Sequence, residues 1–196
     1  MIMDERDDVD LIRAYRKGDE RSFETLVARY VGPIYRFAFR IVRNARDAED
    51  VSQEVFLKTW KHLNRFDVSK SFKAWIFAIA RNASIDFVRK KDPLTFTSLE
   101  RDAGDEGDRY AFDVEDWRPL PDEIVARMQD AEALDGALAE ISPNARAVIL
   151  MHDGEGLTFQ EIADAVHEPM NTVKSRYRRG VESLKAHFAG RHEGAS

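Results

Sequence analysis

The chain has 196 residues, of which 43% are hydrophobic and 34% charged, with a formal net charge of −6 and no cysteine. This composition supports packed cores under a charged surface, and without cysteine it excludes disulfides and thiolate metal sites. No apolar run approaches the roughly 20 residues of a membrane span, and the start, MIMDERDDVD, lacks the layout of a signal peptide. We therefore expect a soluble cytoplasmic protein.

Positive charge is concentrated in two stretches on either side of an acidic one. Residues 72–91 contain five basic side chains and one acidic side chain, and residues 171–187 contain the same numbers. Residues 92–135 contain fourteen acidic and four basic side chains, a net charge of −10. This distribution predicts local contacts with a negative partner rather than a general coat on nucleic acid.

Four helices are predicted in the N-terminal part of the chain, where apolar residues recur at helical spacing. They cover residues 9–17, 23–42, 48–63 and 72–91. Gly18 is a typical residue just after a helix end, and Pro33 is a candidate site for a kink in the second helix. Asp47 is expected to be the N-cap of the third helix, and Pro93 lies just beyond the end of the fourth.

The acidic segment over residues 92–121 shows no sustained periodicity, which is typical of a linker. Helical periodicity resumes over residues 124–141, and Ser142 and Pro143 then form the cap and first-turn pair of another helix. No segment is a convincing strand. We therefore expect an all-α protein with two small helical domains joined by an acidic flexible linker. The expected bounds are residues 1–92, 93–123 and 124–190.

The stretch TFQEIADAVHEPMNTVKSRYRRG, residues 158–180, predicts a helix-turn-helix. Thr158 and Glu161 have the spacing of a capping box, which predicts a short helix over residues 159–166. The segment HEPM forms a tight turn, and a longer basic helix follows over residues 171–187. The chain would therefore end in a module that can bind DNA.

The second of these helices has an apolar stripe and a basic side, at about 100° per residue. The stripe holds Val173, Tyr177, Gly180, Val181 and Leu184, and it is expected to pack on Ile162, Ala163 and Val166. The opposite side holds Ser175, Arg178, Arg179 and Glu182, with Asn171 at the entrance and Lys174 and Arg176 on the flanks. Such a helix fits the major groove of duplex DNA. A solvated charged face on an ordinary helix is the alternative.

The helix over residues 48–63 shows a candidate protein-docking side. Its inward side is expected to hold Val51, Val55, Thr59 and Leu63. Its outward side holds Asp50, Gln53, Glu54, Leu57 and Lys61. A leucine among charged groups on an exposed side is useful for docking, whereas a solvated face with one stray leucine is the alternative.

The helix over residues 72–91 carries basic, amide and aromatic groups beside the polar loop NRFDVSKS. Its buried side is expected to hold Phe72, Ile76, Ile79, Ala80, Ala83 and Phe87. Its outer side is expected to hold Ala78, Arg81, Asn82, Ile85 and Arg89, with Trp75 at the margin. This combination suits single-stranded nucleic acid, because charge follows the backbone and rings stack on bases. Trp75 as a core residue is the alternative.

These segments resemble two domains of bacterial RNA polymerase sigma factors. DAEDVSQEVFLKTW followed by FKAWIFAIARNASIDFVRKK resembles the core domain, region 2, and LTFQEIADAVHEPMNTVKSRYRRGVESLK resembles the promoter-reading domain, region 4. The resemblance covers residues 10–91 and 126–188. Because no third domain fits between them and no long N-terminal extension is expected, the layout resembles the extracytoplasmic-function (ECF) group. The segment HEPMNTVKS differs from the Gly-containing turn that is more frequent in such proteins.

The resemblance implies roles for individual residues. The polymerase clamp would be bound by Asp50, Gln53, Glu54 and Leu57. The melted −10 element would be bound by the loop over residues 66–71 and the helix after it, through Phe66, Lys70, Ser71, Lys73, Trp75, Arg81, Asn82 and Arg89. The −35 element would be read by Asn171, Thr172, Lys174, Ser175, Arg176, Arg178 and Arg179. The implied partners are core RNA polymerase, promoter DNA and an anti-sigma factor, with no cofactor, metal, catalytic residue or membrane insertion.

Two other classes of function are alternatives. An enzyme is disfavoured because the chain lacks G-x-S-x-G, G-x-x-x-x-G-K-[ST] and G-x-G-x-x-G and its five histidines are scattered. A dimeric repressor would need only the C-terminal module, and it would leave Asp50, Gln53, Glu54 and Leu57 without a role. Binding to core RNA polymerase separates a repressor from a sigma factor.

Overall fold

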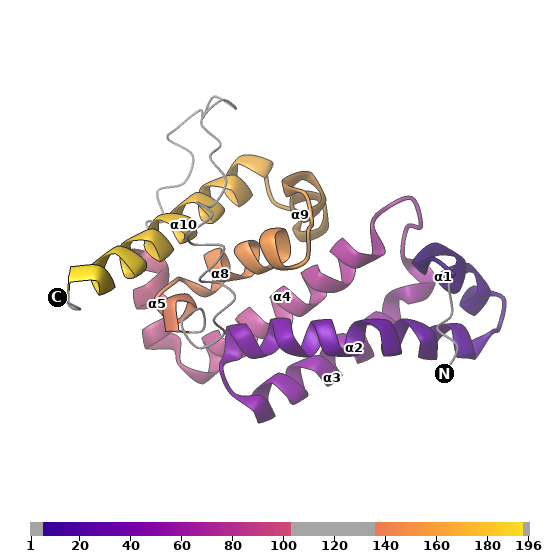
Figure 1. Cartoon of the computed structure of the whole chain (residues 1–196). Helices are drawn as coiled ribbons and strands as arrows, with labels where there is room; N and C mark the ends of the chain where they lie inside the picture. The colour runs from indigo at the N-terminus through magenta and orange to yellow at the C-terminus, as the bar shows by residue number, and fades with distance from the viewer. Residues whose placement is uncertain (1–5, 103–135, 194–196) are drawn as a thin grey trace. The chain divides into compact units, whose positions relative to one another are not determined.

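The computed structural model describes residues 6–102 and 136–193, and every regular element in these two ranges is helical (Figure 1). The predicted all-α class is confirmed. The chain divides into two compact units, Met1–Phe87 and Val88–Ser196, each with buried apolar side chains of its own. Across the described ranges, none of the helices combines the length and the apolar character that crossing a membrane requires.

The N-terminal unit contains α1 (Asp8–Arg16), α2 (Glu20–Val42), α3 (Ala45–His62), the 3-10 turn η1 (Leu63–Arg65) and most of α4 (Phe72–Lys91). The Asp7 carboxylate caps α1 by accepting a hydrogen bond from the backbone N–H of Asp10 at 2.7 Å. Gly18 follows α1 with a φ of 101°, a conformation that favours glycine. Pro33 lies inside α2, and the helix continues beyond it.

The start of α3 differs from the prediction. Asn44 is the N-cap, because its side-chain oxygen accepts a hydrogen bond from the backbone N–H of Asp47 at 3.1 Å. Asp47 instead lies in the first turn, where the helix dipole favours negative charge. Both residues have the short acceptor side chain that an N-cap requires, so the prediction placed the cap three residues too late.

Apolar side chains from every helix of the N-terminal unit fill its core. Fully buried members include Leu11, Ile12, Leu26, Ile34, Leu63, Ile76 and Phe77. The rings of Phe37 and Phe77 meet edge to face at 5.3 Å, which joins α2 to α4. The predicted inward side of α3 is confirmed, since each of its four residues is at most 1% exposed: Val51, Val55, Thr59 and Leu63.

Helix α4 is buried on more sides than predicted. The residues buried as expected are Phe72, Ile76, Ala80 and Ala83, whereas Ile79 and Phe87 are half-buried. Three residues predicted on the outer side are also buried: Ala78, Arg81 and Ile85. Together with Ala74 they follow one another at helical spacing, so α4 carries a second stripe that is mostly small and apolar. The second stripe buries a further side of α4, so the predicted outer side is wrong at these three positions.

The segment predicted as a linker begins with a helix, α5 (Pro93–Asp102). The Asp92 carboxylate accepts a hydrogen bond from the backbone N–H of Thr95 at 3.0 Å, and hydrogen bonds from Thr95 lower the pKa of Asp92. Pro93 stands at the start of α5, where its missing N–H costs nothing. The prediction that residues 93–102 form a linker without helical structure is therefore wrong. The rest of the predicted linker, and the predicted helix up to residue 135, lie outside the described residues.

The C-terminal unit contains α5, α8 (Pro143–Ile149), the π-helical turn η3 (Leu150–Gly154), α9 (Phe159–Val166) and α10 (Met170–Glu193). Both predicted caps are confirmed: the Ser142 hydroxyl caps α8, and Thr158 and Glu161 form the reciprocal capping box of α9. Glu100 of α5 also contacts the start of α8. Its carboxylate accepts hydrogen bonds from the backbone and side-chain N–H groups of Asn144 at 3.2 and 3.0 Å.

Helix α10 packs along one side, as predicted. Its stripe residues Val173, Tyr177, Val181 and Leu184 are at most 5% exposed, Ile162 and Ala163 of α9 are buried, and Val166 is half-buried. Gly180 belongs to the same stripe and lies against α8. A Cβ atom at this position would lie 2.6 Å from Cδ1 of Ile149 and 3.3 Å from Cβ of Ala145. The missing side chain therefore permits the close approach of α10 to α8.

Candidate docking groove and nucleic-acid interfaces

An apolar groove of about 870 Å³ runs between α2 and α3, which lie side by side (Figure 1). It is lined on α2 by Phe23, Val27, Val31, Gly32 and Tyr35, and on α3 by Glu49, Ser52, Gln53, Phe56, Leu57 and Trp60. Val31, Leu57 and Trp60 are 48%, 57% and 52% exposed. Large apolar side chains that stay exposed together in one groove are typical of protein-docking surfaces, so this groove is a candidate docking site.

Two of the four predicted docking residues line this groove. Gln53 and Leu57 are lining residues, whereas Asp50 and Glu54 are exposed on the same helix without lining it. Glu54 forms an ion pair with Lys58 at 2.6 Å, and exposed pairs of this spacing contribute about 0.3–0.5 kcal/mol. The site is thus an apolar groove with carboxylates on the same helix.

Most apolar residues of the groove escape the sequence prediction. On α3, Trp60 follows Gln53 at helical spacing, so it shares a side with the residues that were identified. On α2, a stripe recurs every four residues, at Phe23, Val27, Val31 and Tyr35. The spacing of this stripe predicts a second apolar side of α2. It does not predict that α3 packs beside that side and forms the other wall of the groove.

The loop over residues 66–71, between η1 and α4, is held by its own hydrogen bonds. The Asp67 carboxylate accepts hydrogen bonds from the backbone N–H (3.0 Å) and the hydroxyl (2.8 Å) of Ser69, and these bonds lower the pKa of Asp67. The Ser71 hydroxyl accepts a hydrogen bond from the backbone N–H of Ala74 at 3.2 Å and so caps α4. The loop is therefore an ordered turn that leads into α4.

An aromatic cluster anchors this loop. The ring of Phe66 lies 5.6 Å from that of Phe72 and 4.9 Å from that of Trp75, and Tyr30 of α2 meets Phe72 at 5.4 Å. Phe66 is 6% exposed, whereas Trp75 is half-buried and keeps part of its ring accessible. Burial argues against the predicted direct contact of Phe66 with DNA. Its ring instead holds the start of the loop.

An exposed stripe runs along α4. Trp75, Asn82 and Arg89 are spaced by seven residues, so they share one side of the helix over roughly 21 Å. Asn82 and Arg89 are exposed. Arg81 lies on another side and is 7% exposed, and its Nη1 donates a hydrogen bond to Oδ1 of Asn82 at 3.1 Å. Burial therefore argues against direct DNA contact by Arg81. Of the remaining −10 residues, Lys70 is exposed and Lys73 and Ser71 are half-buried.

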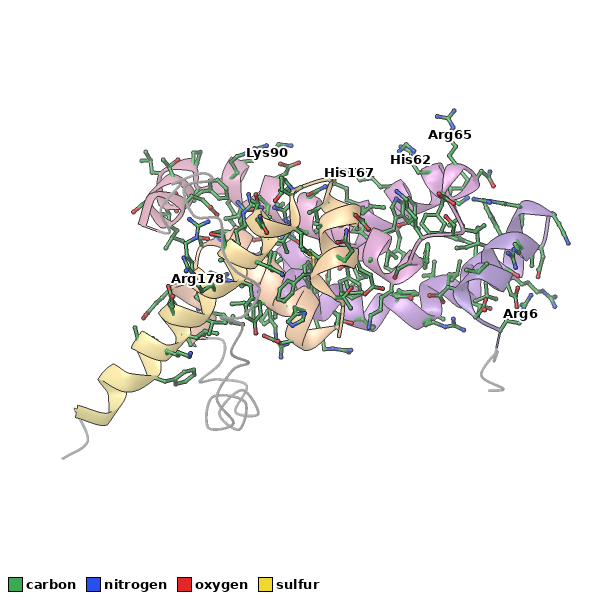
Figure 2. All side chains as sticks on the ribbon, turned by 90° about the horizontal axis from the view of Figure 1, so that it is seen from above. Arg6, His62, Arg65, Lys90, His167 and Arg178 are labelled. Atoms are coloured by element: carbon green, nitrogen blue, oxygen red, sulfur yellow. The ribbon has the colours of Figure 1, made fainter. Side chains whose placement is uncertain are left out.

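The turn between α9 and α10 uses His167 in a left-handed conformation, with φ 58° and ψ 41°. Its backbone N–H donates a hydrogen bond to the carbonyl of Ala163 and so ends α9. This is the backbone conformation that glycine adopts most readily. The turn HEPM therefore ends α9 without glycine, and α10 begins at Met170 (Figure 2 labels His167).

A polar and aromatic cluster joins η3 to α9 and α10. The Tyr177 hydroxyl donates a hydrogen bond to Oδ2 of Asp153 at 2.9 Å. The rings of His152 and Phe159 stack at 4.1 Å, and the Tyr177 ring meets both edge to face at 5.2 and 5.3 Å. Burial raises the pKa of Asp153, and burial with the nearby carboxylate raises the pKa of Tyr177, whose hydroxyl stays a donor. The cluster fixes the rotation of α10 about its axis.

The outer side of α10 presents the predicted −35 residues. Asn171 and Arg178 are exposed, and Thr172, Lys174, Ser175 and Arg179 are half-buried. Figure 2 shows Arg178 projecting from the helix, and its Nε lies 3.8 Å from Oε1 of Glu182. Arg176 differs, because its guanidinium pairs with the Glu168 carboxylate in the turn before α10. Arg178 is thus exposed on the outer side of α10, whereas Arg176 forms an ion pair within the C-terminal unit.

The candidate surfaces are made of apolar, basic and amide side chains. Among residues 6–102 and 136–193, no three His, Asp or Glu side chains are grouped to hold a metal ion. The Asp67 carboxylate accepts hydrogen bonds within its own turn, and the Asp153 carboxylate accepts one from the hydroxyl of Tyr177 on α10. The candidate sites are therefore one groove and two exposed helix sides.

Comparison with known proteins gives the same two domains in the same order. The sigma-70 region 2 model matches residues 26–93, and the sigma-70 region 4 model matches residues 131–184. The chain is 32% identical over 175 residues to the ECF RNA polymerase sigma factor SigW of Bacillus subtilis, covering 89% of this chain and 92% of SigW.

Two solved structures share the fold. One is CnrH in complex with the cytosolic domain of CnrY, with a TM-score of 0.65 and 23% identity over 93% of this chain and 97% of that chain. The other is the sigma factor RpoE in complex with the anti-sigma factor NepR from Bartonella quintana, with a TM-score of 0.61 and 21% identity over 86% and 98%.

The matched ranges contain the surfaces described above, except for Phe23 at the start of the groove. Region 2 includes α3, α4 and most of α2, and region 4 includes α8, α9 and most of α10. Proteins of this kind are transcription initiation factors rather than enzymes. The chain belongs to the ECF sigma factor family, and it is an alternative sigma factor that directs RNA polymerase to promoters.

Proposed function

We propose that three surfaces carry out this function. The α2/α3 groove binds core RNA polymerase, the loop over residues 66–71 and the exposed stripe of α4 bind the melted −10 strand, and the outer side of α10 reads the −35 element. The observation that carries the proposal is the groove, because Leu57 and Trp60 are more than half exposed there beside Val31. A side chain this apolar and this exposed gains most from burial against a partner.

The proposed polymerase contact combines apolar burial with charge. Leu57 and Trp60 would insert into the partner, and Gln53 would contribute hydrogen bonds from the same helix. Asp50 and Glu54 stand exposed outside the groove, where they would meet basic side chains of the polymerase. Exposed charges of this kind speed association and orient the partner more than they add affinity.

The proposed −10 contact relies on the exposed part of Trp75 and on the polar groups beside it. Unpaired bases stack on aromatic rings while basic and amide groups follow the backbone. Trp75, Asn82 and Arg89 supply these groups along one side of α4, and Lys70 adds a charge from the loop. Phe66 and Arg81 would act by supporting this surface from within.

The proposed −35 contact uses the side of α10 that faces away from α8. Asn171, Ser175 and Arg178 follow one another on this side at helical spacing. A helix of this width enters the major groove, where arginine can bond guanine through two hydrogen bonds. Lys174, Thr172 and Arg179 lie on the flanks, where phosphates would be in reach.

The groove assignment is tested with Leu57→Ala and Trp60→Ala, each assayed for binding to core polymerase and for thermal unfolding. Truncation of a central interface residue costs about 2 kcal/mol or more, which is roughly 30-fold in affinity. The unfolding temperature should hardly change, because both side chains are already exposed.

The matched control is Leu94→Ala on α5. Leu94 is also a leucine and is 85% exposed, but it lies outside the groove. Its loss should leave polymerase binding within about twofold. Equal losses for Leu57→Ala and Leu94→Ala would overturn the groove as the polymerase contact, and unaltered binding in all three variants would do the same.

We also propose the domain limits, the cellular location and a further partner. Residues 1–92 form region 2, residues 93–123 connect it to region 4 at residues 124–190, and α5 within this connection packs on α8, in a protein that acts in the cytoplasm. The fold is similar to that of RpoE, which is solved with the anti-sigma factor NepR, and we propose that an anti-sigma factor also binds this chain. Its binding should exclude core polymerase, as measured by size-exclusion chromatography of the three proteins together.

A further inference from the structure

Helix α1 precedes the residues that match region 2, and the roles proposed above give it no function. Its last turn carries Arg16. One nitrogen of this side chain, Nη2, donates hydrogen bonds to the backbone carbonyl of Leu63 at 3.0 Å and to the backbone carbonyl of Phe66. We propose that Arg16 is a positioning residue, through which α1 fixes the root of the loop over residues 66–71 for promoter opening.

Helix α1 is suited to this task because it is fixed at its other end. Leu11 and Ile12 are fully buried. The Asp8 carboxylate in the first turn pairs with Arg29 and accepts a hydrogen bond from the hydroxyl of Tyr30, both on α2. The helix is thus attached to α2 at its start and to the loop at its end, so Arg16 extends from a rigid support.

The two carbonyls that Arg16 contacts lie where the chain leaves the helix. Leu63 begins η1 directly after α3, and the last carbonyls of a helix lack partners within it. The Leu63 carbonyl also accepts a hydrogen bond from the backbone N–H of Phe66 at 3.2 Å. A guanidinium is favoured here by the negative end of the helix dipole, and its fixed N–H directions suit two neighbouring acceptors.

The contact bears directly on the part of the loop that faces DNA in the proposed function. The turn begins one residue after Phe66, where Asp67 accepts hydrogen bonds from Ser69 and its backbone carbonyl accepts one from the N–H of Lys70 at 3.0 Å. Removal of the Arg16 guanidinium leaves these bonds intact. The turn would persist as a unit, but its attachment to the rest of the fold would loosen.

This inference rests on the proposed −10 role of the loop. Its test compares Arg16→Ala, Arg16→Lys and Arg13→Ala in holoenzyme with core polymerase. Arg13 is the matched control, because it lies on the same helix with the same charge and is paired with Asp10 at 3.5 Å, away from the loop. Opening is followed by the fluorescence of 2-aminopurine in the −10 element, on a duplex promoter and on a pre-melted one.

We expect Arg16→Ala to slow opening of the duplex roughly tenfold, in line with the loss of a charged hydrogen bond, with a smaller effect on the pre-melted template. Arg16→Lys keeps the charge but not the planar fork, and it should fall between Arg16→Ala and the parent. Arg13→Ala should match the parent. Binding to core polymerase should stay unchanged in all three, and the unfolding temperature should fall only in the Arg16 variants, by no more than the loss of one hydrogen bond explains.

Two further variants, Lys70→Ala and Asn82→Ala, separate the possible failures. If they slow duplex opening while Arg16→Ala behaves like Arg13→Ala, the positioning role is overturned and the −10 assignment stands. If neither slows opening, the −10 assignment fails and the positioning role fails with it. If Arg16→Ala lowers polymerase binding and the unfolding temperature along with opening, Arg16 is a general structural residue and the inference is overturned.

Discussion

Helices α4 and α10 both face nucleic acid in the proposed function, but they are set into their units in opposite ways. Helix α4 is buried around most of its circumference, including Arg81, and exposes a narrow stripe that contains Asn82 and Arg89. Helix α10 packs along one side, with Gly180 against α8, and leaves a broad side open on which Arg178 projects. The two helices therefore offer DNA surfaces of different width.

This difference matches the two forms of DNA that they would meet. The major groove of a duplex is about 12 Å wide and admits a whole helix, so a helix that reads it has to protrude. Unpaired bases can leave the duplex and stack on a protein surface. Helix α4 can therefore stay embedded in its unit, while the loop over residues 66–71 extends toward the DNA. It follows that inward substitutions in α4 should damage the fold, whereas outward substitutions in α10 should alter recognition.

The largest effect is expected for Phe77→Ala in α4. Phe77 is fully buried and meets Phe37 edge to face, and truncation of such a phenylalanine costs about 3–5 kcal/mol. Thermal unfolding followed by circular dichroism would measure the loss. Ser175→Ala, on the open side of α10, should change stability by less than about 0.5 kcal/mol. Similar losses at both positions would contradict the contrast between an embedded and a protruding helix.

The next effect is on recognition, at Arg178. Arg178→Ala should cost about 1–3 kcal/mol of discrimination at one base pair of the −35 element, because an outward arginine can bond guanine twice. Arg176→Ala should leave the preferred sequence unchanged, because Arg176 pairs with Glu168 in the turn. A library of −35 sequences bound by each holoenzyme across salt concentrations would measure both. A changed preference in Arg176→Ala alone would place the reading side of α10 elsewhere.

A smaller effect is expected where α10 touches α8. Gly180→Ala gains about 1 kcal/mol of helix propensity, but its Cβ would lie 2.6 Å from Cδ1 of Ile149, and overpacking costs about 1–3 kcal/mol. The expected net loss is about 1 kcal/mol in thermal unfolding, with weaker binding to −35 DNA because α10 shifts. Ser183→Ala, an exposed neighbour on the same helix, should be neutral. A gain in stability would show that Ile149 moves aside freely.

Local signals explain why much of the fold was predictable. The caps Ser142 and Thr158 act on N–H groups three residues away, so both partners stand next to each other in the sequence. The same rule misplaced the cap of α3, because Asn44 and Asp47 suit the position equally well. The buried stripe of α10 was predictable because its apolar residues lie on one side only, so the sequence shows which side of the helix faces the core.

Tertiary contacts explain what the sequence could not show. Helix α4 has small or apolar residues on several sides, so the periodicity did not reveal that Arg81 is buried. Leu57 was identifiable as a leucine among charged neighbours, but Val31 reaches the same groove from another helix, and no pattern within either helix pairs them. The contact of Arg16 with the carbonyls of Leu63 and Phe66 likewise joins residues that are far apart in the sequence.

The smallest effect is expected from the cluster that fixes the rotation of α10, and it depends on pH. Burial raises the pKa of Asp153 above the ordinary aspartate value of 3.8. In the window between 3.8 and the raised pKa, the folded chain binds more protons than the unfolded chain, so stability falls as pH rises through it. Asp153→Asn lacks this titration. Its stability relative to the parent should therefore be greatest at neutral pH and should decline as the pH falls to 3.8.

Two controls make this prediction specific to the Asp153 carboxylate. Tyr177→Phe removes the hydroxyl whose hydrogen bond lowers the pKa of Asp153, so the pH window should extend upward in this background. His152→Gln removes the imidazole whose Nε2 lies 3.9 Å from Oδ1 of Asp153 and whose charge lowers the pKa of that carboxyl. In this background the window should extend to higher pH. Thermal unfolding from pH 4 to pH 8 measures all three comparisons. A difference between Asp153→Asn and the parent that is constant with pH would mean that folding does not raise the pKa of Asp153, and the prediction would fail.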